Sequence, residues 1–276
     1  MDPVAVDPIA VDPVAVDVVA VDWSGRRRGS QRHIWTAHVH RGRVIGLTSG
    51  RDRAETADHL IDVASRSERL VVGLDFAFSL PAWFLEAQHL AGAGELWRVA
   101  QAEGERWLAE CAPPFWGRPG RPRPPGVELL RRTERAMGRI GGHGPTSAFQ
   151  IGGAGSVGTG SIRGMPVLRR LRGAGFHVWP FDGPGWPRVI EIYPRRLTGP
   201  VVKRDPGARA AALAHWALAP DVERVAAAGE DAFDALVSAL VMARHAEEIG
   251  ALAPASDAVT LLEGWIWAPV SAGGRP

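Results

Sequence analysis

Three short apolar runs, each ending in a single acidic residue, constrain the fold of this chain more than any other feature. The runs read DVVAVD, LVVGLD and RVIE, and they end at Asp22, Asp75 and Glu191. Runs of β-branched residues of this length favour buried strands. Burying an isolated carboxylate is costly, so each acid needs a partner, a metal ion or a place at the open end of a sheet. We therefore expect all three at the carboxyl ends of strands, where open α/β sheets place their sites.

Helix and strand patterns alternate between these runs. An Arg-Gly turn separates two strand-like segments, residues 32–40 and 42–48, which predicts a β-hairpin, and a further strand is predicted over 176–181. The apolar spacing predicts helices over the following segments: 54–65, 82–111, 165–174, 206–218, 221–228 and 231–249. This order predicts an α/β fold with a mixed sheet, helices on both faces, and a large, mostly helical insertion at about residues 82–175 after the fourth strand.

The beginning of the chain repeats a five-residue unit whose copies end at Asp7, Asp12, Asp17 and Asp22. A period of five matches neither a strand nor a helix, and the proline that opens each of the first three copies removes a backbone donor. We therefore predict a low-complexity, extended tail over residues 1–17, a single domain over 18–270 and a short tail over 271–276. In the fourth copy Val18 replaces the proline, so only this copy can enter a sheet.

Cysteine content and charge narrow the class of protein. The single cysteine, Cys111, excludes an internal disulfide and a multi-cysteine metal site. The sequence has neither a basic leading segment nor an apolar run of membrane-spanning length, so we expect a cytoplasmic protein without membrane segments. Lys203 is the only lysine among 32 basic residues, and the formal net charge is +2. Such arginine bias is typical of a GC-rich genome and is weak evidence for nucleic acid, although clusters such as residues 26–28 could attract a polyanion.

The last long predicted helix adds two more acids. Asp231 and Asp234 are three residues apart and therefore share one helical face. If this helix packs near Asp22, several carboxylates converge, and such a group repels itself unless a cation is present. Oxygen ligands favour Mg²⁺ or Mn²⁺, and one or two such ions can support phosphodiester cleavage. An aspartate after a strand is also a common turn or cap residue, and that interpretation stands for any single one of these acids.

Eight sequence blocks occur in order between about Val18 and Ala268. They are VAVDWSG, VVGLDFAFSLP, RRTE, GAGSVGTGSIRGMPVLRRLR, WPFD, VIEIYPRRLTG, EDAFDALVSALVMA and EGWIWAP. Together they resemble the domain-of-unknown-function 429 family of predicted RNase H-like nucleases. The resemblance implies five mixed strands with flanking helices. It also implies an active site in which acids of the first strand, the fourth strand and the last helix coordinate Mg²⁺ or Mn²⁺.

The resemblance assigns roles to particular positions of this sequence. Asp22, Asp75 and Asp234 are expected to be the principal metal ligands, and Asp231 and Glu191 are expected to be additional ligands or to orient water. Substrate contacts are expected from Ser24, Arg131, Arg132, Glu134, Arg195 and Lys203. The predicted function is a metal-dependent nuclease or phosphodiesterase that acts on nucleic acid. DNA and RNA both remain open as substrates, and so does the oligomeric state.

Two alternatives remain. One is an RNase H-like module that binds nucleic acid or protein without catalysis. The other is an actin-like phosphotransferase, because DWSG resembles the first phosphate loop of those enzymes, although their other glycine-rich motifs are not evident. The glycine-rich stretch FQIGGAGSVG could also be a dinucleotide loop. We predict that the next helix begins only near Met165, too far along the chain for its N-terminus to meet a phosphate there, so we expect a flexible or substrate-facing loop instead.

Overall fold

The computed structural model describes residues 16–142 and 144–269. The predicted tails over residues 1–17 and 271–276 therefore lie outside the described residues, apart from Val16 and Asp17. Asp17 was assigned to the tail, but it is the first residue of the first strand, β1 (Asp17–Asp22). Its carboxylate contacts His38 Nε2 at 2.9 Å and His40 Nδ1 at 2.8 Å and accepts a hydrogen bond from Ser67. Asp17 is therefore part of the folded domain, whose predicted start was residue 18.

The described residues form one mixed sheet with strand order β3-β2-β1-β4-β6-β5. Besides β1, its strands are β2 (Trp35–His40), β3 (Arg43–Thr48), β4 (Leu70–Leu74), β5 (His177–Val178) and β6 (Arg188–Glu191). The hairpin pairs antiparallel with β1, whereas β1, β4, β6 and β5 run parallel to one another. The predicted mixed α/β sheet is confirmed, and the strand predicted over 176–181 is present as the short β5 at the edge beside β6. The five strands that the resemblance implies are one fewer than the sheet contains.

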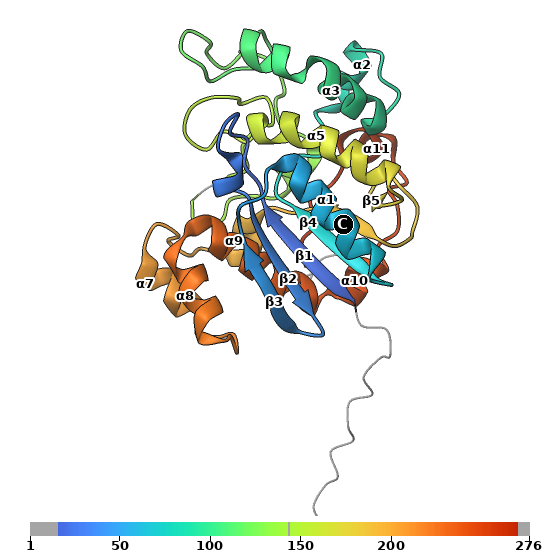
Figure 1. The fold of residues 1–276 in the computed structure, drawn as a ribbon. Coiled ribbons are helices and arrows are strands. Elements are labelled where there is room, and N and C mark those ends of the chain that lie inside the picture. The colour runs from blue at the N-terminus through green and yellow to red at the C-terminus, as the bar shows by residue number, and fades with distance from the viewer. Residues whose placement is uncertain (1–15, 143, 270–276) are drawn as a thin grey trace, which may run out of the picture.

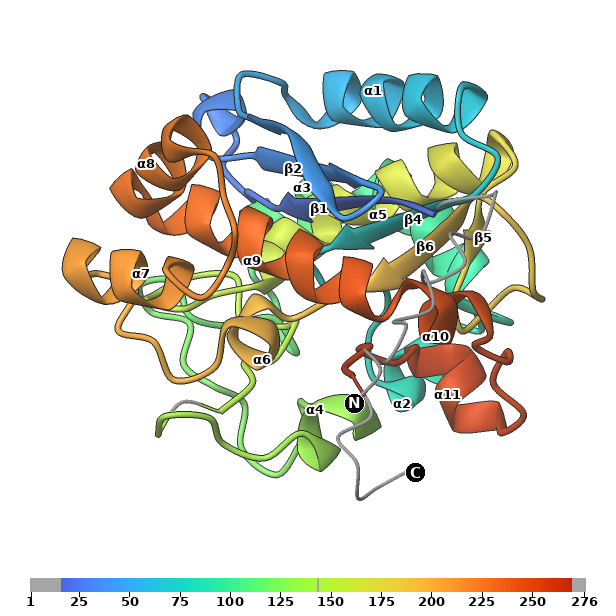
Figure 2. The same ribbon diagram turned by 90° about the horizontal axis from the view of Figure 1, so that it is seen from below.

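Helices cover both faces of this sheet (Figure 1, Figure 2). Helix α1 (Arg53–Ser65) and helix α5 (Gly158–Gly173) lie over one face, and α9 (Glu230–Arg244) lies against the other. Side chains of β1 alternate between the two layers: Val19 and Val21 join the core beneath α1, and Val18 and Ala20 join the core beneath α9. Because alternate residues of a strand face the same side, Asp22 belongs to the α9 face.

Four helices lie between β4 and β5 in the chain: α2 (Ala82–Ala87), α3 (Ala93–Glu110), α4 (Arg132–Ala136) and α5. A single helix was predicted over 82–111, but the structure divides it into α2 and α3. His89 adopts a φ of +55° between them, in the left-handed region that an α-helix cannot continue through. The division lets α3 turn and pack along α5.

Helix α5 begins at Gly158, not near Met165 as predicted. The glycines and Pro166 in this segment suggest a loop, but packing outweighs their low helix propensity. A Cβ atom at Gly164 would lie 2.5 Å from the Phe76 ring, so glycine here permits close packing of α5 on the segment that follows β4. The N-terminus of α5 therefore directly follows the glycine-rich stretch, contrary to the sequence prediction.

The C-terminal third is mainly helical. It contains α6 (Pro194–Thr198), α7 (Pro206–Leu213), α8 (Pro220–Ala228), α9, α10 (Ala246–Gly250) and α11 (Ala258–Glu263). The helix predicted over 231–249 is two helices, because His245 leaves the helical conformation, and the helix predicted over 206–218 ends at Leu213. In the described ranges, none of the helices has both the length and the apolar character needed to cross a membrane. Cys111 is buried as a free thiol.

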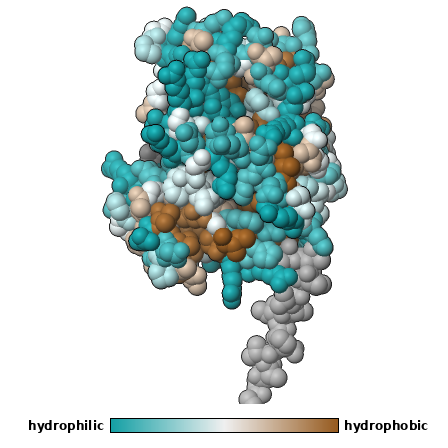
Figure 3. Space-filling model, viewed as in Figure 1, coloured by the Kyte–Doolittle hydropathy of each residue, from teal (hydrophilic) through white to brown (hydrophobic). Residues whose placement is uncertain are grey.

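Apolar side chains gather at the surface beside the free edge of the sheet (Figure 3). Ile45 of the edge strand β3 is 58% exposed. A groove of about 520 Å³ runs between β3, the C-terminal part of α9 and the start of α8, and Trp216 and Leu218 contribute to its wall. This surface is separate from the strand ends that carry the acids.

Candidate functional site: carboxylates at the end of the sheet

Asp22 and Asp75 lie at the carboxyl ends of two neighbouring parallel strands. Asp22 is the last residue of β1, and Asp75 directly follows β4. The two strands stay in register to this point, since the Asp75 backbone N–H donates to the Val21 carbonyl at 3.1 Å. The sheet therefore brings together two acids that are separated by a hairpin and a helix in the sequence.

Helix α9 carries Asp234 to the same end of the sheet. The helix approaches closely because Gly73 of β4 has no side chain: a Cβ atom there would lie 2.6 Å from Met242 Sδ. Packing of α9 against β1 and β2 places its first turns beside Asp22. Asp234 lies in these first turns, three residues after Asp231, with which it was predicted to share a helical face.

Burial and neighbouring acids raise the pKa values of these carboxyls. Burial, followed by the negative charges of Asp75, Asp234 and Asp231, raises the pKa of Asp22 well above its ordinary value. Burial and Asp234 raise the pKa of Asp75 to about 8. Like charges in a low-dielectric site disfavour ionisation, so the group binds protons when no cation is present. Perturbed carboxyls of this kind are typical of functional sites.

One lysine contacts this group. Lys203 Nζ lies 2.6 Å from Asp234 Oδ2, and both side chains are largely buried. Burial raises the pKa of Asp234, and Lys203 is the largest influence that lowers it. The other oxygen, Asp234 Oδ1, is buried and has no hydrogen-bond partner within the described residues. A buried carboxylate oxygen without a donor is a natural position for a cation.

Asp231 lies further out on the same helix. Its side chain is 42% exposed, and its Oδ2 atom is 3.4 Å from His33 Nδ1. His33 precedes β2, and sequence reasoning missed it because no pattern links a histidine in a loop to an acid about 200 residues later. Asp231 therefore belongs to the rim of the carboxylate group.

Glu191 has a different environment from the aspartates. It ends β6, but its position along the strand matches Val189, which faces the core beneath α5. Arg131 donates from both terminal nitrogens to the two Glu191 oxygens, and the Phe78 backbone N–H donates at 2.9 Å. The carboxylate that was expected to be an additional ligand is thus engaged by an internal cation.

Arg131 and Glu134 belong to the same buried network. Arg131 is 1% exposed, and its Nε donates to Glu134 Oε1 at 2.9 Å. Burial alone would lower the pKa of Arg131, but Glu191 and Glu134 raise it well above its ordinary value. The expected phosphate contact from Arg131 is therefore not available in this arrangement, and the guanidinium instead holds α4 against the end of β6.

The other expected substrate contacts are spread around the site. The Ser24 hydroxyl accepts from the Arg26 backbone N–H at 3.3 Å, so it shapes the turn after β1. Arg132 pairs with Asp257 at 2.7 Å on the outside of the molecule. Arg195 donates to the Val201 carbonyl at 2.8 Å and lies near enough to Asp234 to lower its pKa. Of this set, Arg195 and Lys203 are the ones that the structure brings to the carboxylates.

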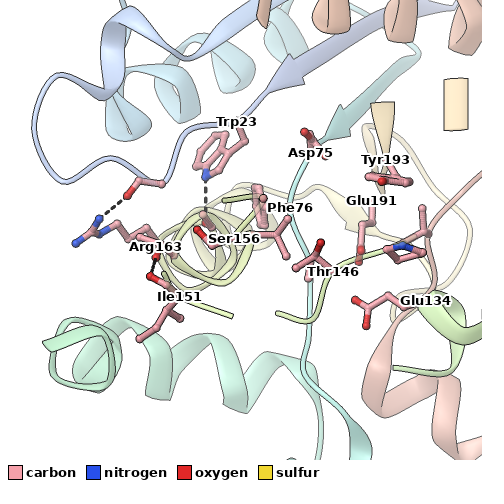
Figure 4. A pocket seen from close by; sticks show the side chains of 18 of the residues that line it. Trp23, Asp75, Phe76, Glu134, Thr146, Ile151, Ser156, Arg163, Glu191 and Tyr193 are labelled. Atoms are coloured by element: carbon pink, nitrogen blue, oxygen red, sulfur yellow. Dashed lines mark hydrogen bonds between the residues drawn. The ribbon is translucent and has the colours of Figure 1, made fainter. Parts of the chain in front are cut away.

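A pocket of about 730 Å³ opens beside Asp75 (Figure 4). Asp75 and Tyr193 line it from the strand ends, and Thr146 and Ser156 line it from the insertion. Burial and then Asp75 raise the pKa of the Tyr193 phenol. The sequence contained no signal for Tyr193, which lies two residues beyond Glu191. Five arginines also line the pocket: Arg26, Arg27, Arg118, Arg163 and the buried Arg131.

The donor chemistry of the carboxylate group fits a hard divalent cation, because it consists of oxygen atoms and includes the unpartnered Asp234 Oδ1. Its present arrangement is not a finished coordination sphere. In the part of the chain that the structure describes, no three His, Cys, Asp or Glu side chains are placed so that they could hold a metal ion together. Binding would therefore require Asp22, Asp75 and Asp234 to move toward a common point.

Comparisons with protein-family models, curated proteins and solved structures found no match to this chain.

Proposed function

We propose that this chain is a metal-dependent phosphodiesterase that acts on nucleic acid, built on an RNase H-like fold. The observation that carries the proposal is the group formed by Asp22, Asp75 and Asp234, whose pKa values are all raised by burial. Retaining so many mutually repelling acids at one point is costly for folding. A cation-binding site explains why these acids are kept together, because a bound cation offsets their mutual repulsion.

Each part of the site has a role in this proposal. Asp22, Asp75 and Asp234 would hold Mg²⁺ or Mn²⁺, which supplies the positive charge that a phosphodiester needs as it gains negative charge in the transition state. Lys203 and Arg195 balance the remaining charge around Asp234. Arg131 keeps Glu191 in place at the back of the pocket, where it raises the pKa of Asp75. The Tyr193 hydroxyl is a further donor beside Asp75.

The RNase H-like assignment is supported by where the acids lie. They follow the first and fourth strands and occupy the start of the long helix α9, which are the positions that the sequence resemblance implies. The sixth strand and the pairing of Glu191 with Arg131 are differences from that expectation.

One observation favours a second candidate, a nucleic-acid-binding module without catalytic activity. Lys203 already neutralises Asp234, and the described acids do not converge on a common ion position. A chain that needs no metal would keep this arrangement in solution. Binding of divalent cations therefore decides between the two candidates.

The test combines metal binding with cleavage. Titration of the purified chain with Mn²⁺, followed by electron paramagnetic resonance, should show binding that Asp75→Asn weakens and Asp221→Asn does not. Asp221 is an exposed acid in the first turn of α8 and serves as a matched control. A panel of labelled single-stranded and double-stranded DNA and RNA should show cleavage that requires Mn²⁺ or Mg²⁺. Undiminished cleavage by Asp75→Asn, or cleavage in excess chelator, contradicts the proposal.

A further inference from the structure

The pocket beside Asp75 is closed on the side opposite the sheet by the insertion. Thr146 and Ser156 from the loops of the insertion face the strand-end residues across it (Figure 4). Thr159 from the first turn of α5 also lines the pocket. A substrate that reaches Asp75 through this pocket must therefore fit between the sheet and the insertion. This inference rests on the proposed function, because it takes Asp75 as part of the reacting centre.

The size of the pocket limits what can enter. Its volume of about 730 Å³ lies within the range of pockets that enclose one small organic molecule. A nucleotide in the middle of a duplex carries its paired partner and stacked neighbours, and enzymes that need such a nucleotide must extrude it at an energetic cost that is least when the strand is already unpaired. An unpaired nucleotide enters without that cost.

The mouth of the pocket carries positive charge that the protein does not neutralise. Neither Arg26 nor Arg118 forms an ion pair with another described residue, whereas Arg170 pairs with Asp58 and Arg172 with Asp182 elsewhere on the surface. Free guanidinium groups at the entrance of a pocket are suited to phosphate, which they bind through charge-assisted hydrogen bonds.

The loop that carries Arg118 is held firmly in place. Trp116 pairs with the segment near Gln150 through two backbone hydrogen bonds, Trp116 N to Phe149 O at 3.0 Å and Ile151 N to Trp116 O at 2.9 Å. Gly117 has a φ of +100°, and a Cβ atom there would lie 2.3 Å from the Gly152 carbonyl oxygen. Only glycine permits this crossing, which fixes the direction in which the next residue leaves the loop.

The turn that carries Arg26 is held by a second arginine of the pocket. Arg163 donates to the Gly25 carbonyl and pairs with Glu105 at 2.6 Å, so its charge is used within the protein. The Trp23 indole donates to the Gly160 carbonyl at 3.2 Å and closes the same turn against α5. Arg26 is thus presented by a supported turn beside the reacting end of β1.

We propose that the pocket takes one unpaired nucleotide of a single-stranded nucleic acid, with its flanking phosphates bound by Arg26 of the turn after β1 and Arg118 of the insertion. Tyr193, which is partly exposed in the pocket beside Asp75, offers an aromatic face on which the base can stack (Figure 4). The substrate class is therefore a single strand or an unpaired end, and paired duplex is excluded from Asp75.

Binding without turnover tests this proposal directly. The full chain with Asp75→Asn is mixed in chelator with a fluorescent strand of about 12 nucleotides, as DNA or as RNA, or with the blunt duplex of the same sequence, and anisotropy is measured. We expect the single strands to bind at least about tenfold more tightly than the duplex, and Arg118→Glu and Arg26→Glu each to weaken strand binding about tenfold, as expected for the loss of a phosphate contact. Arg224→Glu, at an exposed position on α8, is the matched charge control and should leave binding unchanged.

The outcomes separate this inference from the proposed function. Equal affinity for strand and duplex, or equal effects of Arg118→Glu and Arg224→Glu in variants that retain the wild-type circular dichroism spectrum, overturns the inference. Cleavage of blunt duplex as fast as single strand also overturns it and leaves the nuclease proposal intact. Strand binding that depends on Arg26 and Arg118, without cleavage in Mg²⁺ or Mn²⁺, supports the inference and removes the nuclease.

Discussion

Asp17 and Asp22 end consecutive copies of one five-residue unit, lie at opposite ends of β1, and are each 8% exposed. At Asp17, burial raises the carboxyl pKa, but hydrogen bonds with Ser67, His38 and His40 outweigh burial and lower the pKa below its ordinary value. At Asp22, burial and three neighbouring aspartates raise the pKa. The two acids have the same exposed fraction, but Asp22 lies deeper in the protein and faces other acids, whereas Asp17 has hydrogen-bond partners that outweigh its burial. Depth and partners together separate a structural anchor from a site of chemistry.

Val18 in place of proline, rather than the Asp17 anchor, explains which copy of the repeat forms the strand. Asp17 joins β1 to His38 and His40 of β2 and to Ser67, just before β4, so it ties the strand to both neighbours. Sliding the chain by one unit would place Pro13 where Val18 now lies, opposite Val39 of β2 and Val71 of β4. Proline has no N–H to donate in the middle of a sheet, so this register is disfavoured.

The largest expected difference between Asp22 and Asp17 is in the rate of catalysis. Asp22→Asn should lower the rate of Mn²⁺-dependent cleavage at least about a hundredfold, because it removes a charged group from the reacting centre. Asp17→Asn should leave the rate close to that of wild type, since Asp17 lies at the far end of β1. Initial rates on a labelled single strand measure both. Equal losses of cleavage rate in Asp22→Asn and Asp17→Asn would show that the two ends of β1 do not differ in function.

Lys203 provides the next largest effect, on stability at the Asp22 end. Lys203→Met removes the cation that contacts Asp234 and leaves the carboxyl buried without a partner. Breaking a buried pair in this way should lower the free energy of unfolding by about 3 kcal/mol, measured by urea denaturation at neutral pH. Added Mn²⁺ should restore more stability to this variant than to wild type. Arg204→Met, at the neighbouring exposed position, is the control. A loss of stability in Lys203→Met no larger than that in Arg204→Met would contradict a stabilising pair between Lys203 and Asp234.

At the opposite end of β1, the expected loss is smaller. Asp17→Asn weakens the contacts with His38, His40 and Ser67, and it should lower the free energy of unfolding by about 1–2 kcal/mol. Asp22→Asn should leave stability unchanged or raise it, because asparagine cannot ionise and so avoids the cost of either protonating or charging a buried carboxyl beside other acids. Urea denaturation of the two variants under the same conditions compares them. A larger loss for Asp22→Asn than for Asp17→Asn would reverse the proposed roles.

The sequence was sufficient to place the acids at strand ends because that signal is local. A β-branched run followed by Asp22 or Asp75 identifies both the strand and its end, and a three-residue spacing puts Asp231 and Asp234 on one face of α9. The mixed sheet with helices on both faces follows from the same alternation of patterns. These features depend on neighbours in the chain, which a single sequence contains.

The rest of the site depends on contacts that no local pattern encodes. Arg131 and Glu191 are 60 residues apart, and their pairing decides that Glu191 is a structural partner rather than a free ligand. Helix α5 begins early because Gly164 packs on Phe76, a contact that a propensity argument cannot include. The arginine clusters are visible in the sequence, but only the fold shows that Arg26 and Arg118 have no ion-pair partner among the described residues, whereas Arg163 pairs with Glu105.

A further expected effect is a pH dependence of opposite sign at the two kinds of acid. The folded pKa of Asp75 is about 8, whereas an unfolded aspartate titrates near about 3.9, so between these values the folded state holds a proton that the unfolded chain has released. The free energy of unfolding of wild type should therefore fall as the pH rises through this window. Asp17 has a lowered folded pKa, so its contribution is present above the unfolded value and is lost as the pH falls through the folded one.

Asp75→Asn isolates the first of these effects, because asparagine resembles the protonated carboxyl at every pH. Relative to this variant, wild type should lose at least about 1 kcal/mol of stability between about pH 5 and about pH 8, measured by urea denaturation in chelator. Saturating Mn²⁺ should reduce the difference, because a bound cation replaces the proton as the partner of the carboxylate. Parallel stability curves for wild type and Asp75→Asn across this range would mean that the pKa of Asp75 is not raised in the folded protein. Asp75 would then not share the raised pKa that distinguishes Asp22 from Asp17.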